Sequence, residues 1–101
     1  MPIKMKELPE TERPYEKLEQ YGEKTLTNAE LLAIIIKTGT KEETAVGLAQ
    51  QILKLNTNKE ENLSFLRDLT VEEFMKIKGI GKVKAIQLKA VCELATRMNA
   101  V

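Results

Sequence analysis

The 101-residue sequence has no histidine and no tryptophan, and its single cysteine is Cys92. Histidine is the commonest metal ligand and the usual general base of enzymes, so its absence argues against a metal centre or acid–base catalysis. The acidic pairs at 42–43, 60–61 and 72–73 are adjacent along the chain, so they do not face one another on a helix. We therefore expect no enzymatic activity, no metal and no cofactor, with Cys92 as a small core residue.

The sequence also lacks a long apolar run. The stretch from Leu31 to Ile36 is far too short to cross a membrane, and residues 1–6 lack the apolar centre of a signal peptide. One cysteine cannot form a disulfide within the chain, which fits a reducing compartment. These absences predict a cytoplasmic protein with no membrane partner.

Aromatic residues are scarce at 4%, although hydrophobic residues make up 43% of the chain. Leucine, isoleucine, alanine and methionine must then supply most of the core, and helices pack well with these residues. The length suits one small domain. Composition thus favours a single helical domain.

The N-terminal residues 1–12 are polar and contain two prolines, which predicts a flexible arm ahead of a domain over 13–101. Pro14 suits the first turn of a helix, because its missing N–H would have no partner there. That helix is expected to run to Tyr21 and to stop at Gly22.

Thr27 and Glu30 have the spacing of a capping box, in which each side chain accepts a hydrogen bond from the backbone N–H of the other residue. The apolar run 31–36 follows directly. Its three isoleucines equally suit a strand by propensity, but the cap leads into the run and favours a helix. The nearly all-apolar surface of this helix implies a central, buried position.

Further helices are predicted downstream. The spacing of apolar residues predicts one helix over 45–55 and a shorter one over 63–69. A second capping box at Thr70 and Glu73 opens another helix, and the last helix is expected over 82–98. The apolar stripe of that last helix consists of Ala85, Leu88, Cys92 and Ala95, widened by Val91, Leu94 and Met98.

The two halves of the chain follow the same plan, which is a capped helix, a glycine turn and a second helix. Gly39 and Gly79 are 40 residues apart. The first turn is degenerate, because Lys41 stands where the second turn has Gly81. Two such units would bury each other's apolar faces. The predicted fold class is all-α, with five or six short helices in a degenerate tandem of helix-hairpin-helix units.

The second turn, Lys78-Gly79-Ile80-Gly81-Lys82, leads to the functional prediction. We expect a Cβ at either glycine to obstruct a tight hairpin, and Ile80 to turn into the core. The amides that follow begin a helix, where unpaired N–H groups and the helix dipole attract an anion such as a DNA phosphate. The alternative is a turn that only links two helices. The predicted DNA-contact residues are Lys78, Gly79, Ile80, Gly81, Lys82, Val83 and Lys84.

The distribution of charge supports this location, although the net charge of the chain is only +1. Residues 74–101 carry six basic and one acidic side chain, a net charge of +5. Residues 1–73 carry ten basic and fourteen acidic side chains, a net charge of −4. The basic excess therefore gathers around the glycine hairpin, as expected of a phosphate-binding face.

The first turn is a candidate for a second DNA contact through its backbone amides and threonine hydroxyls. Glu42 and Glu43 follow it and would repel a phosphate, so a capped turn without a ligand is the alternative. The residues of this second candidate contact are Thr38, Gly39, Thr40 and Lys41.

In its ordered combination of motifs, the chain resembles the N-terminal region of the bacterial RadC family, which is associated with DNA repair. The matching segments are Arg13–Leu18, Leu26–Ile34, Lys37–Thr40 and Ile77–Ala85. Together with the last helix they span nearly the whole chain. The final hairpin alone is shared by many helix-hairpin-helix proteins, whereas the combination is specific.

The resemblance implies an all-helical domain built from helix-hairpin-helix elements. In the RadC family a larger domain that resembles JAMM metallopeptidases normally follows, with zinc ligands from histidine and aspartate. That domain is not in this sequence, so we expect either a truncated or a stand-alone form. In a longer parent protein, the resemblance implies that such a metallohydrolase domain is the partner of this region.

The predicted function is binding of DNA through its backbone, without sequence specificity, in DNA repair or recombination. The alternative is a protein-interaction or scaffolding domain that docks a partner or a metallohydrolase domain, with the hairpin purely structural. The near-neutral net charge favours this alternative.

Overall fold

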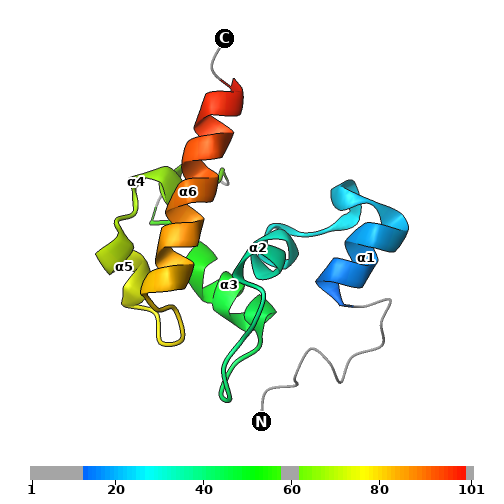
Figure 1. The fold of residues 1–101 in the computed structure, drawn as a ribbon, viewed down its shortest axis with the longest axis horizontal. Helices are drawn as coiled ribbons and strands as arrows, with labels where there is room; N and C mark the ends of the chain where they lie inside the picture. Colours follow the sequence, from blue (N-terminus) through cyan, green and yellow to red (C-terminus); the bar gives the residue numbers. More distant parts are fainter. Residues whose placement is uncertain (1–12, 58–61, 100–101) are drawn as a thin grey trace.

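A computed structural model describes residues 13–57 and 62–99, so the predicted arm over 1–12 lies outside the described residues. The described residues form six α-helices and one 3₁₀ helix, which confirms the all-α class (Figure 1). The elements are α1 (Pro14–Tyr21), η3 (Glu23–Thr25), α2 (Asn28–Ile36), α3 (Ala45–Leu53), α4 (Phe65–Asp68), α5 (Val71–Met75) and α6 (Lys82–Asn99).

The helices form two helix–turn–helix units, α2 with α3 and α5 with α6, as the repeat predicts. α2 is central, because it packs against α1, α3 and α6. The short helix α4 packs on α6. In Figure 1 the C-terminal part of α6 extends beyond the other helices, whereas both inter-helix turns lie at the opposite side of the molecule.

Both capping boxes predicted from the sequence are present. The Glu30 amide donates to Thr27 Oγ1 over 3.2 Å, and the Thr27 amide donates to Glu30 Oε1 over 2.9 Å. The equivalent bonds between Thr70 and Glu73 are 3.1 and 3.0 Å long. Each box satisfies two amides that would otherwise have no partner at a helix start.

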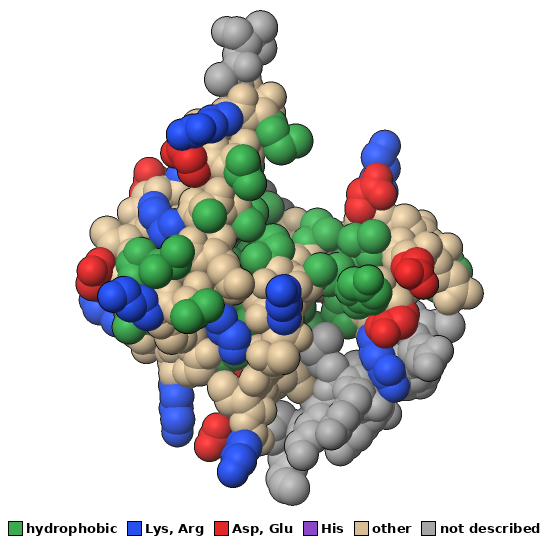
Figure 2. Space-filling view, viewed as in Figure 1, with side chains coloured by type: hydrophobic (Ala, Val, Ile, Leu, Met, Phe, Trp, Pro, Cys, Tyr) green, Lys and Arg blue, Asp and Glu red, His purple; other side chains and the backbone are tan. Residues whose placement is uncertain are grey.

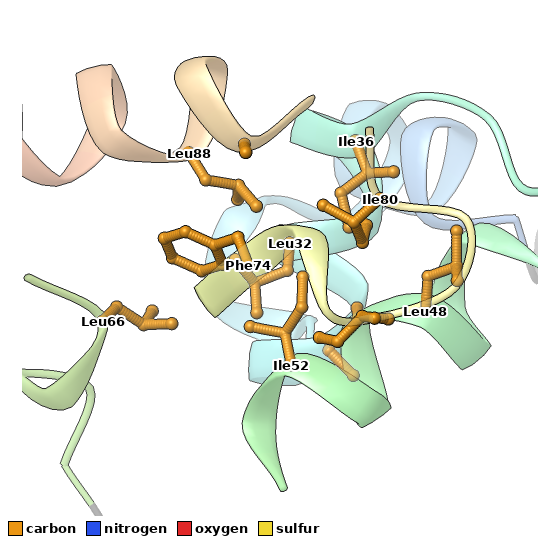
Figure 3. Packing of buried hydrophobic residues seen from close by; sticks show 12 residues of the cluster. Leu32, Ile36, Leu48, Ile52, Leu66, Phe74, Ile80 and Leu88 are labelled. Atoms are coloured by element: carbon orange, nitrogen blue, oxygen red, sulfur yellow. The ribbon is translucent and has the colours of Figure 1, made fainter. Parts of the chain in front are cut away.

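The core lies between the two units and joins side chains from both (Figure 3). Phe74 of α5 is completely buried, and so are Leu48 and Ile52 of α3. Leu32 of α2 and Leu88 of α6 reach the same cluster. The two units therefore bury each other's apolar faces, as predicted, and neither has this core without the other.

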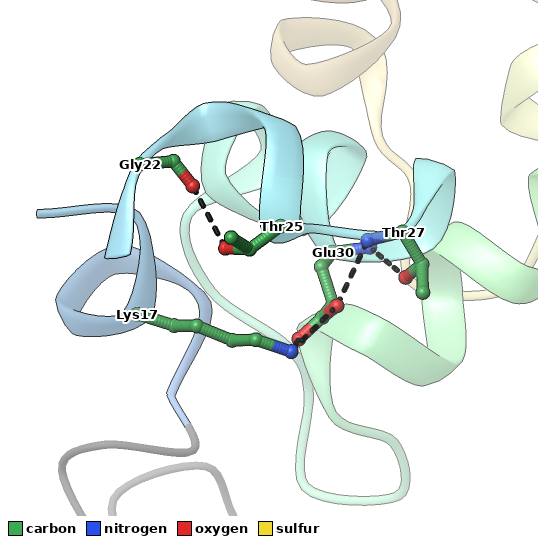
Figure 4. Close-up of polar contacts among 5 residues, drawn as sticks. All are labelled: Lys17, Gly22, Thr25, Thr27 and Glu30. Carbon is green, nitrogen blue, oxygen red and sulfur yellow. Dashed lines mark hydrogen bonds and ion pairs between the residues drawn. The ribbon is translucent and has the colours of Figure 1, made fainter. Parts of the chain in front are cut away.

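α1 is joined to α2 by an ion pair (Figure 4), and Pro14 at the start of α1 is buried. Lys17 Nζ lies 3.3 Å from Glu30 Oε2, so the same carboxylate caps α2 and pairs with α1. The connection begins at Gly22, whose φ of 93° favours glycine, and Thr25 Oγ1 donates to its carbonyl over 2.8 Å. The sequence did not predict η3 in this connection.

The apolar stripe of the last helix is buried only in part. Ala85 and Leu88 are buried, but Leu94 is 62% exposed and Met98 is 83% exposed. α6 has 18 residues and extends beyond the helices that could cover its end. The predicted apolar stripe is therefore buried at Ala85 and Leu88, whereas Leu94 and Met98, which widen it, lie on the surface.

The threonine caps give a first prediction. Replacing Thr27 or Thr70 with alanine should lower the free energy of unfolding by about 1 kcal/mol each, because an amide at the helix start would then have no acceptor. The control is Thr57→Ala, at an exposed position that caps no helix among the described residues. Urea unfolding followed by circular dichroism measures the difference, and equal effects at all three positions would contradict the capping role.

A second prediction concerns acid. Burial raises the pKa of Glu30, but hydrogen bonds from Thr27 and the Lys17 ammonium outweigh it and bring the pKa below its ordinary value of 4.5. Hydrogen bonds from Thr70 lower the pKa of Glu73 in the same way. The unfolded chain then binds more protons than the folded chain at low pH. The stability that these two carboxylates contribute should be fully present above pH 4.5 and should be lost as the pH drops through their lowered pKa values.

The test of this pH dependence is urea unfolding at about pH 7 and about pH 3 for the wild type and for the Glu30→Gln/Glu73→Gln double variant. The variant cannot titrate at these positions and should show a smaller decrease in stability on acidification. Exposed Glu19→Gln on α1 is the control and should behave as the wild type does. An identical decrease in the double variant would show that these two carboxylates do not set the pH dependence.

Candidate nucleic-acid interface

The second turn is built as a rigid link between α5 and α6. The Ile80 amide donates to the Ile77 carbonyl over 3.0 Å, and both side chains are buried, with Ile80 only 3% exposed. Ile80 turns into the core as predicted. Gly79 has a φ of 101°, a conformation that other residues rarely adopt. Apolar packing of Ile77 and Ile80 against the core thus holds the turn in place, whereas Lys78 and Gly81 are exposed on its outer side.

The two turns pack against each other. A Cβ at Gly79 would lie 2.8 Å from Thr40 Cγ2 and 3.0 Å from Leu48 Cδ2. Nearby, Lys84 Nζ donates to the Thr38 carbonyl over 2.9 Å. The absence of a side chain at Gly79 therefore allows the second turn to approach the first, and Lys84 joins them with a hydrogen bond.

The two glycines of the hairpin have different roles. A Cβ at Gly81 would meet nothing within 4 Å, and Gly81 is not among the positive-φ residues. The prediction that a Cβ would obstruct the hairpin at either glycine is right for Gly79 and wrong for Gly81. Gly81 is exposed and stands immediately before α6. Its carbonyl accepts the first hydrogen bond of that helix, from the Ala85 amide over 3.0 Å.

The start of α6 carries free amides. Thr27, Thr44 and Thr70 cap α2, α3 and α5 with their side-chain oxygens, but glycine at position 81 has no side chain to do the same. Among residues 13–57 and 62–99, no hydrogen bond uses the amides of Gly81, Lys82 or Val83. All three residues are exposed. These unpaired N–H groups therefore belong to exposed residues at the positive end of an 18-residue helix.

The three lysines predicted to flank the phosphate differ in their surroundings. Lys78 and Lys82 are exposed, and neither forms an ion pair within the described part of the chain. Lys84 is half-buried, and its ammonium is already bonded to Thr38. Lys78 and Lys82 are thus the lysines free to meet an anion, whereas Lys84 links the turns.

The first turn satisfies most of its own polar groups. The Thr40 amide donates to the Glu43 carbonyl over 2.7 Å, and Thr40 Oγ1 accepts bonds from the Glu42 and Glu43 amides. A Cβ at Gly39 would clash with the Glu43 carbonyl oxygen, so this turn also needs its glycine. Lys41 is exposed at its tip. Figure 2 shows basic side chains at the side of the molecule where the two turns lie.

The predicted packing role of Cys92 has a structural account. Cys92 is half-buried beside the core, and burial raises the pKa of its thiol, although Lys89 and Arg67 act in the opposite direction. A neutral thiol at neutral pH fits a packing role. Within the described ranges, no three acidic or cysteine side chains come together as metal ligands would, and no helix is long and apolar enough to cross a membrane.

The site and fold together define a small helical domain with an uncapped, lysine-flanked helix start. Comparison with known proteins then supplies the family. The family model described as UPF0758 N-terminal matches residues 5–86, which include both turns and the start of α6. The chain belongs to the UPF0758 family, and the expected likeness to the N-terminal region of the RadC family is confirmed.

Similar proteins are longer than this chain. A UPF0758 protein of Alkaliphilus oremlandii is 47% identical over 97 residues, which are 96% of this chain and 40% of the relative. A UPF0758 protein of Caldanaerobacter subterraneus subsp. tengcongensis is 46% identical over 95% of this chain and 40% of its own length. A UPF0758 protein of Clostridium novyi is 47% identical over 97% of this chain and 41% of its own length. The chain thus spans about two fifths of these relatives, and no solved structure matches it significantly.

A third prediction compares the two glycines with the same substitution. Gly79→Ser should lower the free energy of unfolding by about 1–3 kcal/mol, because its φ is unfavourable for serine and the new Cβ would contact Thr40. Gly81→Ser should leave it unchanged or raise it by a few tenths of a kcal/mol, because serine is a good helix cap in open space. Thermal and urea unfolding measure both, and equal effects would contradict the distinct roles.

Proposed function

We propose that this domain binds the phosphate backbone of DNA without sequence specificity, through the turn between α5 and α6. The observation that carries the proposal is the group of unpaired amides at Gly81, Lys82 and Val83. A phosphate oxygen is a suitable acceptor for such amides, and the helix dipole favours its negative charge. Exposed Lys78 and Lys82 flank this position and would add attraction to neighbouring phosphates.

The hairpin residues would have different roles in the proposed phosphate contact. Gly79 and Ile80 hold the turn in place from within, whereas Gly81 to Val83 offer amides. Lys84 acts as a link to Thr38. The first turn contributes Lys41 as a peripheral charge, whereas its Thr40 amide and hydroxyl already have partners.

Backbone contacts without base contacts imply weak binding, with a dissociation constant of roughly 10⁻⁴–10⁻⁶ M at physiological salt. A DNA-binding role would also locate the protein in the bacterial cytoplasm, and the RadC resemblance suggests repair or recombination as its context. Any hydrolytic activity of the longer relatives would lie in the three fifths of their length that this chain does not span.

A fourth prediction tests the amides. A serine hydroxyl at position 81 would accept hydrogen bonds from amides in the first turn of α6 and compete with a phosphate for them. Gly81→Ser should therefore weaken binding to duplex DNA by about three- to tenfold, although the protein is at least as stable. Fluorescence anisotropy with a labelled duplex at low salt measures the affinity. Unchanged affinity in a folded Gly81→Ser protein would overturn the phosphate contact.

The lysines are tested in the same assay through salt dependence. For the Lys78→Ala/Lys82→Ala variant, the slope of log affinity against log salt should decrease by about 0.9 for each phosphate that is no longer neutralised. Lys24→Ala/Lys54→Ala is the matched control, with two exposed lysines in η3 and after α3 that are outside the hairpin. Equal slopes in the two double variants would remove Lys78 and Lys82 from the interface.

A second candidate function is protein docking, the alternative that the sequence leaves open. The observation that favours it is the exposed apolar end of α6. The two functions use opposite ends of the same helix, so they are compatible.

A further inference from the structure

The C-terminal part of α6 forms one wall of an apolar groove. Its other walls are α2 and the segment from Leu63 to Arg67, and its volume is about 340 Å³. Leu31 and Ile35 of α2 line it together with Val91 and Ala95 of α6. In Figure 2 hydrophobic side chains follow the projecting part of α6 and continue over α2.

Large hydrophobic side chains are exposed on this part of the surface. Leu63, Val91, Leu94 and Met98 are all large hydrophobic side chains with at least 37% of their surface exposed. Leu63 and Val91 line the groove, and Leu94 and Met98 belong to the same C-terminal part of α6. Other exposed hydrophobic side chains, such as Tyr15 and Val83, lie away from the groove. A contiguous exposed apolar surface of this kind marks an interaction site. Arg67 is the one charged side chain among the described residues that line the groove.

The length of the relatives indicates what covers the groove. The matching family model describes an N-terminal region, and this chain spans 40% of the Alkaliphilus oremlandii protein. The larger part of that protein therefore follows the region equivalent to α6. Asn99, the last residue of α6, itself lines the groove. Polypeptide that continues from α6 thus begins at the edge of this apolar surface.

We propose that the groove between α2, α4 and α6 is the docking surface for the C-terminal part of UPF0758 proteins. The docking segment would present apolar side chains to Val91 and Ala95, with a carboxylate or a backbone carbonyl opposite Arg67. α6 would then act as a rigid arm that holds the following part at a fixed position relative to the turns at its other end. This proposal does not depend on DNA binding.

The experiment compares this 101-residue chain with a chimera, in which it replaces the matching two fifths of the Alkaliphilus oremlandii protein. Hydrogen exchange is followed by mass spectrometry in peptides covering 63–67 and 91–98. Docking should slow exchange there by about tenfold in the chimera, with little change in a peptide over 76–83. The unmodified Alkaliphilus oremlandii protein provides a second measurement, and its matching segments should be protected equally.

Two exposed alanines of α6 provide matched variants. Ala95 lines the groove, whereas Ala90 lies on a different side of the helix. Ala95→Glu should abolish the added protection in the chimera, because it places a charge in the apolar contact, and Ala90→Glu should not. Neither should change exchange at the groove in the 101-residue chain by itself.

Three outcomes would overturn the proposal. One is equal exchange at 63–67 and 91–98 in the 101-residue chain and in both longer proteins. Another is an equal effect of Ala90→Glu and Ala95→Glu on the chimera. The third is protection in the 101-residue chain that grows with its concentration, because a second copy would then be the occupant of the groove.

Discussion

The close contact between the two glycine turns is the constraint on which the rest of this structure depends. Gly79 leaves room for Thr40 and Leu48, and Lys84 donates to the Thr38 carbonyl beside them. This contact aligns the α5–α6 unit on the α2–α3 unit, so that Phe74 enters a core shared by both. Close packing of this kind tolerates little added volume, so a Cβ at position 79 would require Thr40 or Leu48 to shift.

The contact between the two turns also determines where the two ends of α6 lie on the surface. With the turns held together, the start of α6 lies at one side of the molecule and its C-terminal part extends beyond the opposite side. The first end has unpaired amides and exposed lysines beside the exposed Val83, whereas the apolar groove lies at the other end. One rigid helix thus connects a proposed DNA contact with a proposed docking surface. A longer UPF0758 protein could use this geometry to hold its C-terminal part near DNA.

Much of the local structure could be read from sequence, because its signals lie within a few residues. Thr27 with Glu30 and Thr70 with Glu73 are three residues apart, and both capping boxes form as predicted. The cap also decided correctly that the isoleucine run is a helix. For the candidate site, sequence predicted the position of the turn and the burial of Ile80. It could not distinguish Gly79 from Gly81, because only Gly79 has neighbours from the other turn.

By itself, the sequence determined the α-helices, the caps of α2 and α5 and the concentration of basic charge near the hairpin, since each depends on residue type and short spacing. The tertiary structure decided which of these groups are free. Lys84 is bonded to a carbonyl 46 residues away, whereas Lys78 and Lys82 remain exposed. Leu94 and Met98 continue an apolar stripe but emerge from the core, because α6 is longer than the helices packed on it. Contacts between distant segments decide both the bonding of Lys84 and the exposure of Leu94 and Met98. Such contacts cannot be predicted from the spacing of residues along the chain.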